Sequence, residues 1–157
     1  MGVSRRYNPD WNGWDLIDEH KDKFGKIKHG KELLIPGLEE LVKQRYKDKY
    51  WKKMHGDKIK HDGIAISLFD FFINSEMGAA KSMQRALQRI GFRIEADGVI
   101  GPLTINAINT VAPIILNDYF TEERLEYYNE IVIRDSSQVV YLSGWKNRAL
   151  RFQKLLA

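Results

Sequence analysis

Two polar side chains, Asp70 and Asn74, interrupt an otherwise apolar segment, residues 63–75. Their four-residue spacing places them on one face of a helix. A carboxylate on a buried helix is costly unless it is hydrogen-bonded or lies at a water-lined cleft. The pair therefore predicts either a polar strip on the floor of a groove or a carboxylate that accepts N–H groups from a neighbouring loop.

A turn motif follows in residues 97–104, Asp-Gly-Val-Ile-Gly-Pro-Leu-Thr. Gly98 permits a positive φ, and Pro102 presets the first turn of a following helix. The segment therefore predicts a structural turn that leads into a helix. The residues singled out in this turn motif are Asp97, Gly98, Gly101 and Thr104.

The sequence contains no motif for metal binding, thiol chemistry or nucleotide binding. Cysteine is absent, and no two histidines have the spacing of metal ligands on one helix face. The chain also lacks a phosphate-binding glycine loop and the Gly-x-Ser-x-Gly turn of serine hydrolases. We therefore expect no metal and no cofactor.

Length and composition indicate one domain, or one domain with a small module, because the chain has 157 residues and is 43% hydrophobic. The net charge is +4, with a basic segment at 43–60 that has eight Lys and Arg against two Asp. Such clusters suit nucleic acid, acidic lipid or an anionic wall polymer, or are simply solvated helix faces. The N-terminus has no apolar stretch typical of a Sec signal peptide, and we expect no stable membrane insertion.

These residues must be positioned by helices, because strand signals are nearly absent. We predict an all-α fold of six or seven helices round one core, with residues 63–75 at its centre. The expected helices are 14–24, 36–50, 63–75, 78–90, 101–111, 113–135 and, last, from about Trp145 to Leu156.

Five motifs occur in order and resemble those of one family. They are Tyr50-Trp51, Leu68-Phe69-Asp70 with Asn74, Gln84-Arg85-Ala86-Leu87, Asp97-Gly98-x-Ile100-Gly101-Pro102-x-Thr104 and Gly144-Trp145-x-Asn147-Arg148. The chain resembles the lysozyme-like N-acetylmuramidases also labelled secretion activator proteins, glycoside hydrolase family one hundred and eight. The resemblance implies a lysozyme-like helical fold with a muramidase-like part, 1–76, and a predicted peptidoglycan-binding helical part, 77–157, packed as one unit.

The same resemblance implies hydrolysis of β-1,4 bonds in bacterial peptidoglycan by a protein of phage or prophage type. Its partner would be the glycan strands, reached in the periplasm after release from the cytoplasm, and not nucleic acid. Aromatic residues would stack on sugar rings, unless Trp51 and Trp145 serve ordinary helix packing. The residues assigned to the groove are Tyr50, Trp51, Asp70, Asn74, Trp145, Asn147 and Arg148.

One departure from the family concerns the catalytic acid. Family members begin with a helix that carries Glu-Gly-Gly-Tyr, and its Glu is the expected acid. A later Gly-Ile/Val-Thr/Ser segment is matched here by Gly2-Val3-Ser4, which places that Glu upstream of Met1. Glu76 also stands where the family has Gly. We therefore assign no catalytic residue among these 157, and the alternatives are a silent peptidoglycan-binding or secretion-accessory protein, or a helical nucleic-acid binder.

We expect the 157-residue chain to show weak muramidase activity or none, and the same gene extended upstream to lyse purified walls. General acid–base help is worth roughly 10²–10⁴-fold. Loss of turbidity of peptidoglycan at equal protein concentration compares the two forms. Without the family's catalytic helix, apolar surface would be exposed, and this surface would favour self-association. Equal clearing by both forms would place the acid within these residues.

Overall fold

The computed structural model describes residues 3–27 and 33–156, and every regular element in that part of the chain is helical. It contains seven α-helices, which confirms the predicted all-α fold and helix number. Met1 and Gly2, on which the comparison with the family partly rests, lie outside the described residues. None of the described helices is long and apolar enough to cross a bilayer.

The helices form two compact units, Met1–Lys49 and Tyr50–Ala157, and each has its own hydrophobic cluster. The expectation of one core is therefore wrong. A physical reason lies in residues 43–49, Lys-Gln-Arg-Tyr-Lys-Asp-Lys, which are mostly charged and offer few apolar side chains to join the two clusters.

The first unit contains the short 3₁₀ turn η1 (Arg5–Tyr7) and the helices α1 (Gly13–Phe24) and α2 (Leu38–Tyr46). Its cluster is built on the buried side chains of Trp11, Ile17 and Leu38. Gly13 makes room for the indole of Trp11, because a Cβ at that position would lie 2.3 Å from the ring.

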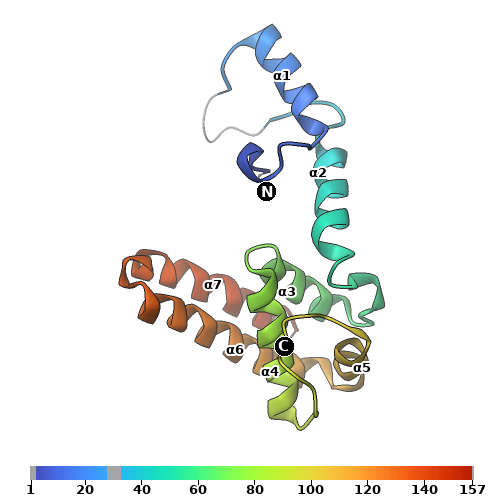
Figure 1. Cartoon of the computed structure of the whole chain (residues 1–157), viewed down its shortest axis with the longest axis vertical. Helices are drawn as coiled ribbons and strands as arrows, with labels where there is room; N and C mark the ends of the chain where they lie inside the picture. Colours follow the sequence, from blue (N-terminus) through green and yellow to red (C-terminus); the bar gives the residue numbers. More distant parts are fainter. Residues whose placement is uncertain (1–2, 28–32, 157) are drawn as a thin grey trace. The chain divides into compact units, whose positions relative to one another are not determined.

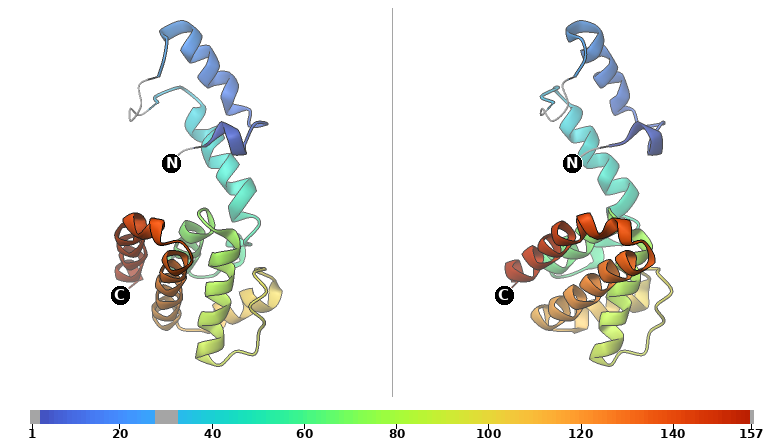
Figure 2. Two further views of the ribbon diagram at one scale, coloured as in Figure 1. Left: turned by 60° about the vertical axis from the view of Figure 1, so that its left-hand side comes forward. Right: turned by 90° about the vertical axis from the view of Figure 1, so that its left-hand side faces the viewer.

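The second unit contains α3 (Asp62–Phe72), α4 (Glu76–Ile90), α5 (Pro102–Thr110), α6 (Pro113–Arg134) and α7 (Val139–Leu156). The helices α6 and α7 lie side by side and run in opposite directions (Figure 2). The short turns are η2 (Lys47–Trp51), which spans the boundary between the units, η3 (Gly56–Lys58) and η4 (Ser136–Gln138).

The second unit is built from α3 to α7 (Figure 1), and its core includes side chains of both α3 and α6. Leu68 and Phe71 of α3 are completely buried, as the apolar sequence predicts. The helix α6 likewise packs against α3, α4 and α7, and its Leu116 and Phe120 are fully buried. The prediction placed residues 63–75 at the centre, and α3 shares this place with α6, whose inner face combines apolar side chains with the buried Asn117 and Arg124.

The last helix begins at Val139, earlier than the predicted start at Trp145. The Asp135 carboxylate accepts the N–H of Ser137 at 3.1 Å and caps η4, which leads directly into α7. Gly144 lies inside the helix, and among the described residues no heavy atom beyond its chain neighbours and the helix's own backbone lies within 4 Å of its Cβ position. The earlier start places the aromatic residues on both sides of this glycine on one continuous helix.

The turn motif is bound to α4 by a single buried side chain, Gln84. Its Oε1 accepts the N–H of Gly98 at 2.9 Å, and its Nε2 donates to Asp97 Oδ1 at 2.7 Å and to the carbonyl of Val99 at 3.0 Å. Gly98 has a φ of +86°, a conformation that favours glycine. The amide of Gln84 therefore holds the turn in place from inside the unit.

The other motif residues connect this turn to α5. Gly101 directly precedes the helix, and Thr104 in its first turn is buried. The N–H of Val99 donates to Asp97, and with the Gln84 bond it lowers the pKa of that carboxyl. The turn motif is thus a structural support for α5 rather than an arrangement of reactive groups.

Replacement of Gln84 by Ala should lower the free energy of unfolding by about 2–4 kcal/mol, since it leaves a cavity and several unpaired polar groups. The variant should also raise the pKa of Asp97. A group with a lowered folded-state pKa stabilises the fold above its unfolded pKa, here 3.8, and loses that contribution as the pH falls through the folded value. Urea unfolding and NMR titration of Asp97 measure the two effects.

The matched control is Gln88→Ala, whose exposed amide makes one hydrogen bond to the carbonyl of Ile94. It should cost less than about 1 kcal/mol. Equal losses for the two variants would contradict the role assigned to Gln84.

Candidate functional site

Asp70 lies at the centre of an ion-pair network that joins three helices of the second unit. Its Oδ2 accepts Nη2 of Arg124, on α6, at 2.7 Å. Its Oδ1 accepts Nη2 of Arg148, on α7, at 2.6 Å, and Nε of Arg148 lies 3.0 Å from both oxygens. Side-chain exposure rises from 1% at Arg124 through 13% at Asp70 to 52% at Arg148. The network thus runs from the interior to the surface.

The inner guanidinium has further contacts that make its burial tolerable. Arg124 Nε donates to the hydroxyl of Tyr128 at 2.8 Å, and its guanidinium lies 4.8 Å from the ring centre of Phe71. Burial raises the pKa of the Tyr128 phenol, so this group stays neutral and accepts the hydrogen bond. Among the described residues, Nη1 of Arg124 has no hydrogen-bond partner, and Asp70 is the anion that offsets the charge of this guanidinium.

The sequence predicted that Asp70 either belongs to a polar strip in a groove or accepts N–H groups from a neighbouring loop. The second prediction is wrong about the donors. The donors to Asp70 are guanidinium groups from α6 and α7, far away in the sequence. Asn74 lies just beyond the end of α3, and its exposed amide donates to the backbone carbonyl of Asp70 at 2.7 Å. Asn74 therefore ends the helix rather than joining the carboxylate network.

A row of residues on α7, which we call the α7 strip, lies beside this network. It consists of Tyr141, Trp145 and Arg148, spaced to share one face of the helix. The rings of Tyr141 and Trp145 are stacked, with centroids 5.8 Å apart at 27°, and Trp145 also packs on Tyr128 at 5.5 Å. Tyr141 is 57% exposed. The strip therefore offers solvent an aromatic surface that ends in a cation.

The Asp70 carboxylate holds the cation of the α7 strip. Its hydrogen bonds raise the pKa of Arg148, although desolvation opposes that shift. Asn147 is the neighbouring residue, and it is exposed. Of the residues expected in a groove, Asp70, Trp145 and Arg148 are therefore brought together. Asn147 directly precedes Arg148 in the chain, and Asn74 follows Asp70 by four residues.

Tyr50 and Trp51 lie in a different part of the second unit. The Trp51 indole donates to Asp57 Oδ1 at 2.7 Å and meets the ring of Phe69 edge-on at 5.3 Å. A Cβ on Gly56 would lie 2.3 Å from the Trp51 ring, so the tight turn η3 requires glycine there. Tyr50 is half-buried against the same core. These contacts give Trp51 a packing role.

Sequence reasoning missed three residues of this site, namely Arg124, Tyr128 and Tyr141. Tyr141 precedes Trp145 by four residues, so helical spacing could have identified it had the last helix been extended. The sequence gives no such signal for Arg124, because its acidic neighbours suggest a solvated face.

Replacement of Asp70 by Ala should lower the free energy of unfolding by more than about 1 kcal/mol, and by up to roughly 3–5 kcal/mol, because it leaves the Arg124 charge buried and unpaired. Arg148→Ala is the control that removes an exposed partner, and it should cost no more than about 1 kcal/mol. Urea unfolding measures both. An unchanged midpoint for Asp70→Ala would show that the carboxylate is idle.

A solved structure supports the fold. The match to the "Structure of Brucella abortus SagA" has a TM-score of 0.53 and 22% sequence identity, and it covers 88% of this chain and 77% of that chain. At this identity the likeness establishes the fold alone. No curated protein matches the sequence significantly.

Family models match nearly the whole chain in two segments. Residues 1–76 match Glycosyl hydrolase 108, and residues 78–150 match the Predicted Peptidoglycan domain. Asp70 thus belongs to the first segment, and the α7 strip belongs to the second. Packing instead divides the chain after Lys49, and the assignment of separate roles to 1–76 and 77–157 stays a prediction. The chain therefore combines a Glycosyl hydrolase 108 segment at its N-terminal end with a Predicted Peptidoglycan domain.

Proposed function

We propose that this protein is a lysozyme-type peptidoglycan hydrolase, an N-acetylmuramidase that cleaves β-1,4 bonds of the wall glycan, and that the α7 strip binds the glycan strand. The matches to Glycosyl hydrolase 108 and to the Predicted Peptidoglycan domain support the substrate class. The observation that carries the proposal is the exposed Tyr141, stacked on the half-buried Trp145 beside Arg148. The wall in the periplasm is the proposed place of action, while prophage origin rests on the sequence resemblance alone.

The α7 strip has the chemistry that a sugar chain needs. Aromatic faces suit the apolar C–H faces of pyranose rings, and neighbouring polar groups orient the hydroxyl and acetamido groups. Because Asp70 holds the guanidinium of Arg148, this cation is ordered before a ligand arrives. Asn147 adds an exposed amide next to it.

The carboxyl groups in or next to the matched motifs are those of Asp70, Glu76 and Asp97, and none of them is suited to act as a general acid. Glycoside hydrolysis needs a protonated carboxyl beside the leaving oxygen. Both oxygens of Asp70 accept guanidinium hydrogen bonds, Asp97 has a lowered pKa, and Glu76 pairs with Lys53. We therefore assign none of these three carboxyls as the acid.

Because these three carboxyl groups are already paired, a second candidate function is also favoured: a peptidoglycan-binding or secretion-accessory protein that does not cleave the glycan. The two candidates share the glycan-binding surface and differ in catalysis. Binding to purified walls together with release of reducing ends supports the hydrolase, and binding alone supports the accessory protein.

Replacement of Tyr141 by Ala should weaken co-sedimentation with purified peptidoglycan by about twofold to tenfold, as expected for the loss of one aromatic contact of about 0.5–1.5 kcal/mol. The side chain is exposed, so the fold should be kept, and circular dichroism checks this. The matched control is Tyr7→Ala, another exposed tyrosine, at 70%, in the first unit. Wild-type sedimentation of Tyr141→Ala would rule out the α7 strip as the glycan-binding surface.

A further inference from the structure

The first unit contains an open pocket of about 480 Å³ that is separate from the α7 strip. One wall comes from the segment that leads into α1, and the other comes from α2 and the turn that follows it. A volume of this size falls within the range of roughly 300–1,000 Å³ typical of small-molecule sites. The lining residues are Asp10, Trp11, Asn12, Leu41, Gln44, Arg45, Asp48 and Lys49.

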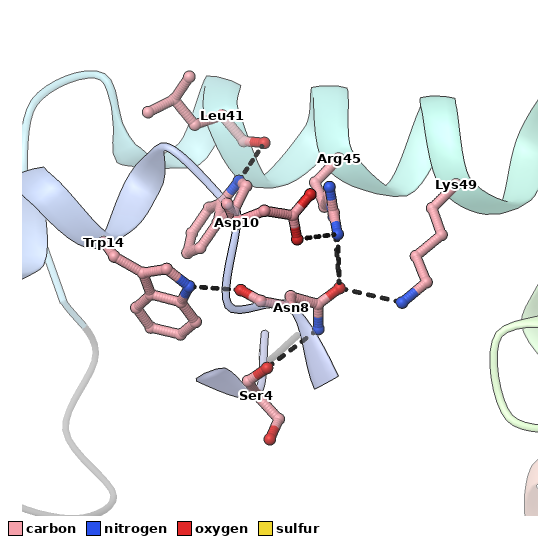
Figure 3. Close-up of polar contacts among 8 residues, drawn as sticks. Ser4, Asn8, Asp10, Trp14, Leu41, Arg45 and Lys49 are labelled. Atoms are coloured by element: carbon pink, nitrogen blue, oxygen red, sulfur yellow. Dashed lines mark hydrogen bonds and ion pairs between the residues drawn. The ribbon is translucent and has the colours of Figure 1, made fainter. Parts of the chain in front are cut away.

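A buried asparagine holds the two cations of the pocket (Figure 3). Oδ1 of Asn8 accepts Nε and Nη2 of Arg45 at 3.3 and 3.1 Å and Nζ of Lys49 at 3.0 Å. Asn8 is 7% exposed, its amide donates to the carbonyl of Ser4 at 3.0 Å, and its carbonyl accepts the indole N–H of Trp14 at 2.6 Å. The pocket is therefore preorganised by contacts from beneath it.

The charges that line the pocket balance. Arg45 and Lys49 face the carboxylates of Asp10 and Asp48, and Arg45 Nη2 lies 3.3 Å from Asp10 Oδ1. A hydrogen bond from its own backbone N–H and the nearby Arg45 charge lower the pKa of Asp10, which keeps it ionised. Two carboxylates at the wall repel a polyanion, so a ligand without large net charge fits better.

The remaining lining combines neutral amides with an apolar floor. Asn12 and Gln44 are exposed, and Gln44 donates to Asp48 at 2.7 Å. Trp11 is buried, and its indole donates to the Leu41 carbonyl at 3.4 Å. Donors and acceptors thus surround an apolar base. Hydroxyl groups, which both donate and accept, and an acetamido group match this pattern.

We propose that this pocket binds one N-acetylated, uncharged hexosamine residue of a glycan strand. The choice of a glycan strand as the source rests on the proposed function, whereas the preference for a neutral, hydroxyl-rich ring rests on the pocket itself. Lys49 and Arg45 meet the acetamido carbonyl or ring hydroxyls, and the carboxylate of Asp10 accepts hydroxyl protons. Asn12 and Gln44 complete the polar wall.

The experiment is an NMR titration of the full chain with the β-1,4-linked tetramer of N-acetylglucosamine. Saturable shifts of the amide signals of residues 10–12 and 44–45 are expected. The double variant Asn12→Ala with Gln44→Ala should weaken the affinity read from these signals by roughly tenfold or more, since two hydrogen bonds are lost. Asn129→Ala, an exposed asparagine on α6, is the matched control and should bind as wild type does.

Several outcomes separate this site from the proposed function. Shifts confined to residues 141–148, or an unchanged affinity in the double variant, would overturn the pocket while the glycan-binding role of the α7 strip stands. Equal binding of the de-N-acetylated, cationic tetramer would overturn the preference for an acetamido group. Saturable pocket shifts in a chain that does not sediment with peptidoglycan would support the pocket and contradict the proposed function.

Discussion

A guanidinium that is buried in a hydrophobic interior needs an anion to neutralise it, and in the second unit Arg124 is such a group. Its side chain is 1% exposed and lies over the ring of Phe71, so water cannot screen its charge. Asp70 supplies the compensating carboxylate from α3. Removal of either partner leaves a buried charge, whereas an apolar replacement of the whole network would be tolerated better. The arrangement of α3 against α6 therefore depends on this contact.

The same carboxylate also fixes the third helix of the group. Arg148 reaches Asp70 from α7 with both its Nε and Nη2, a two-point contact that is sensitive to the register of the helix. Tyr128 links the two ends of the site, because its hydroxyl accepts from Arg124 while its ring packs on Trp145. An aromatic surface open to solvent is in this way anchored to a buried charge, which suits ligand binding without rearrangement.

The two ways of dividing the chain bear on how binding and catalysis are connected. The helix α3 lies within the segment that matches Glycosyl hydrolase 108, yet it packs with the helices of the Predicted Peptidoglycan domain. Asp70 and its arginines bridge these segments directly. The boundary between the two family models is consequently not a boundary in the packing, and substitutions in one segment affect the packing of the other.

The sequence by itself determined the helical class, the position of most helices and the turn at Gly98, since these follow from local periodicity, capping and the freedom of glycine. It also singled out Asp70 as a polar group on an apolar helix. Only the tertiary structure decided that the partners of Asp70 are arginines from α6 and α7, because they lie 54 and 78 residues away and no local pattern marks Arg124 as buried. It likewise decided that the apolar residues form two clusters, and that Asn8 holds Arg45 across 37 residues. Long-range pairing of charges depends on how helices pack, and that is a property of the whole chain rather than of any segment.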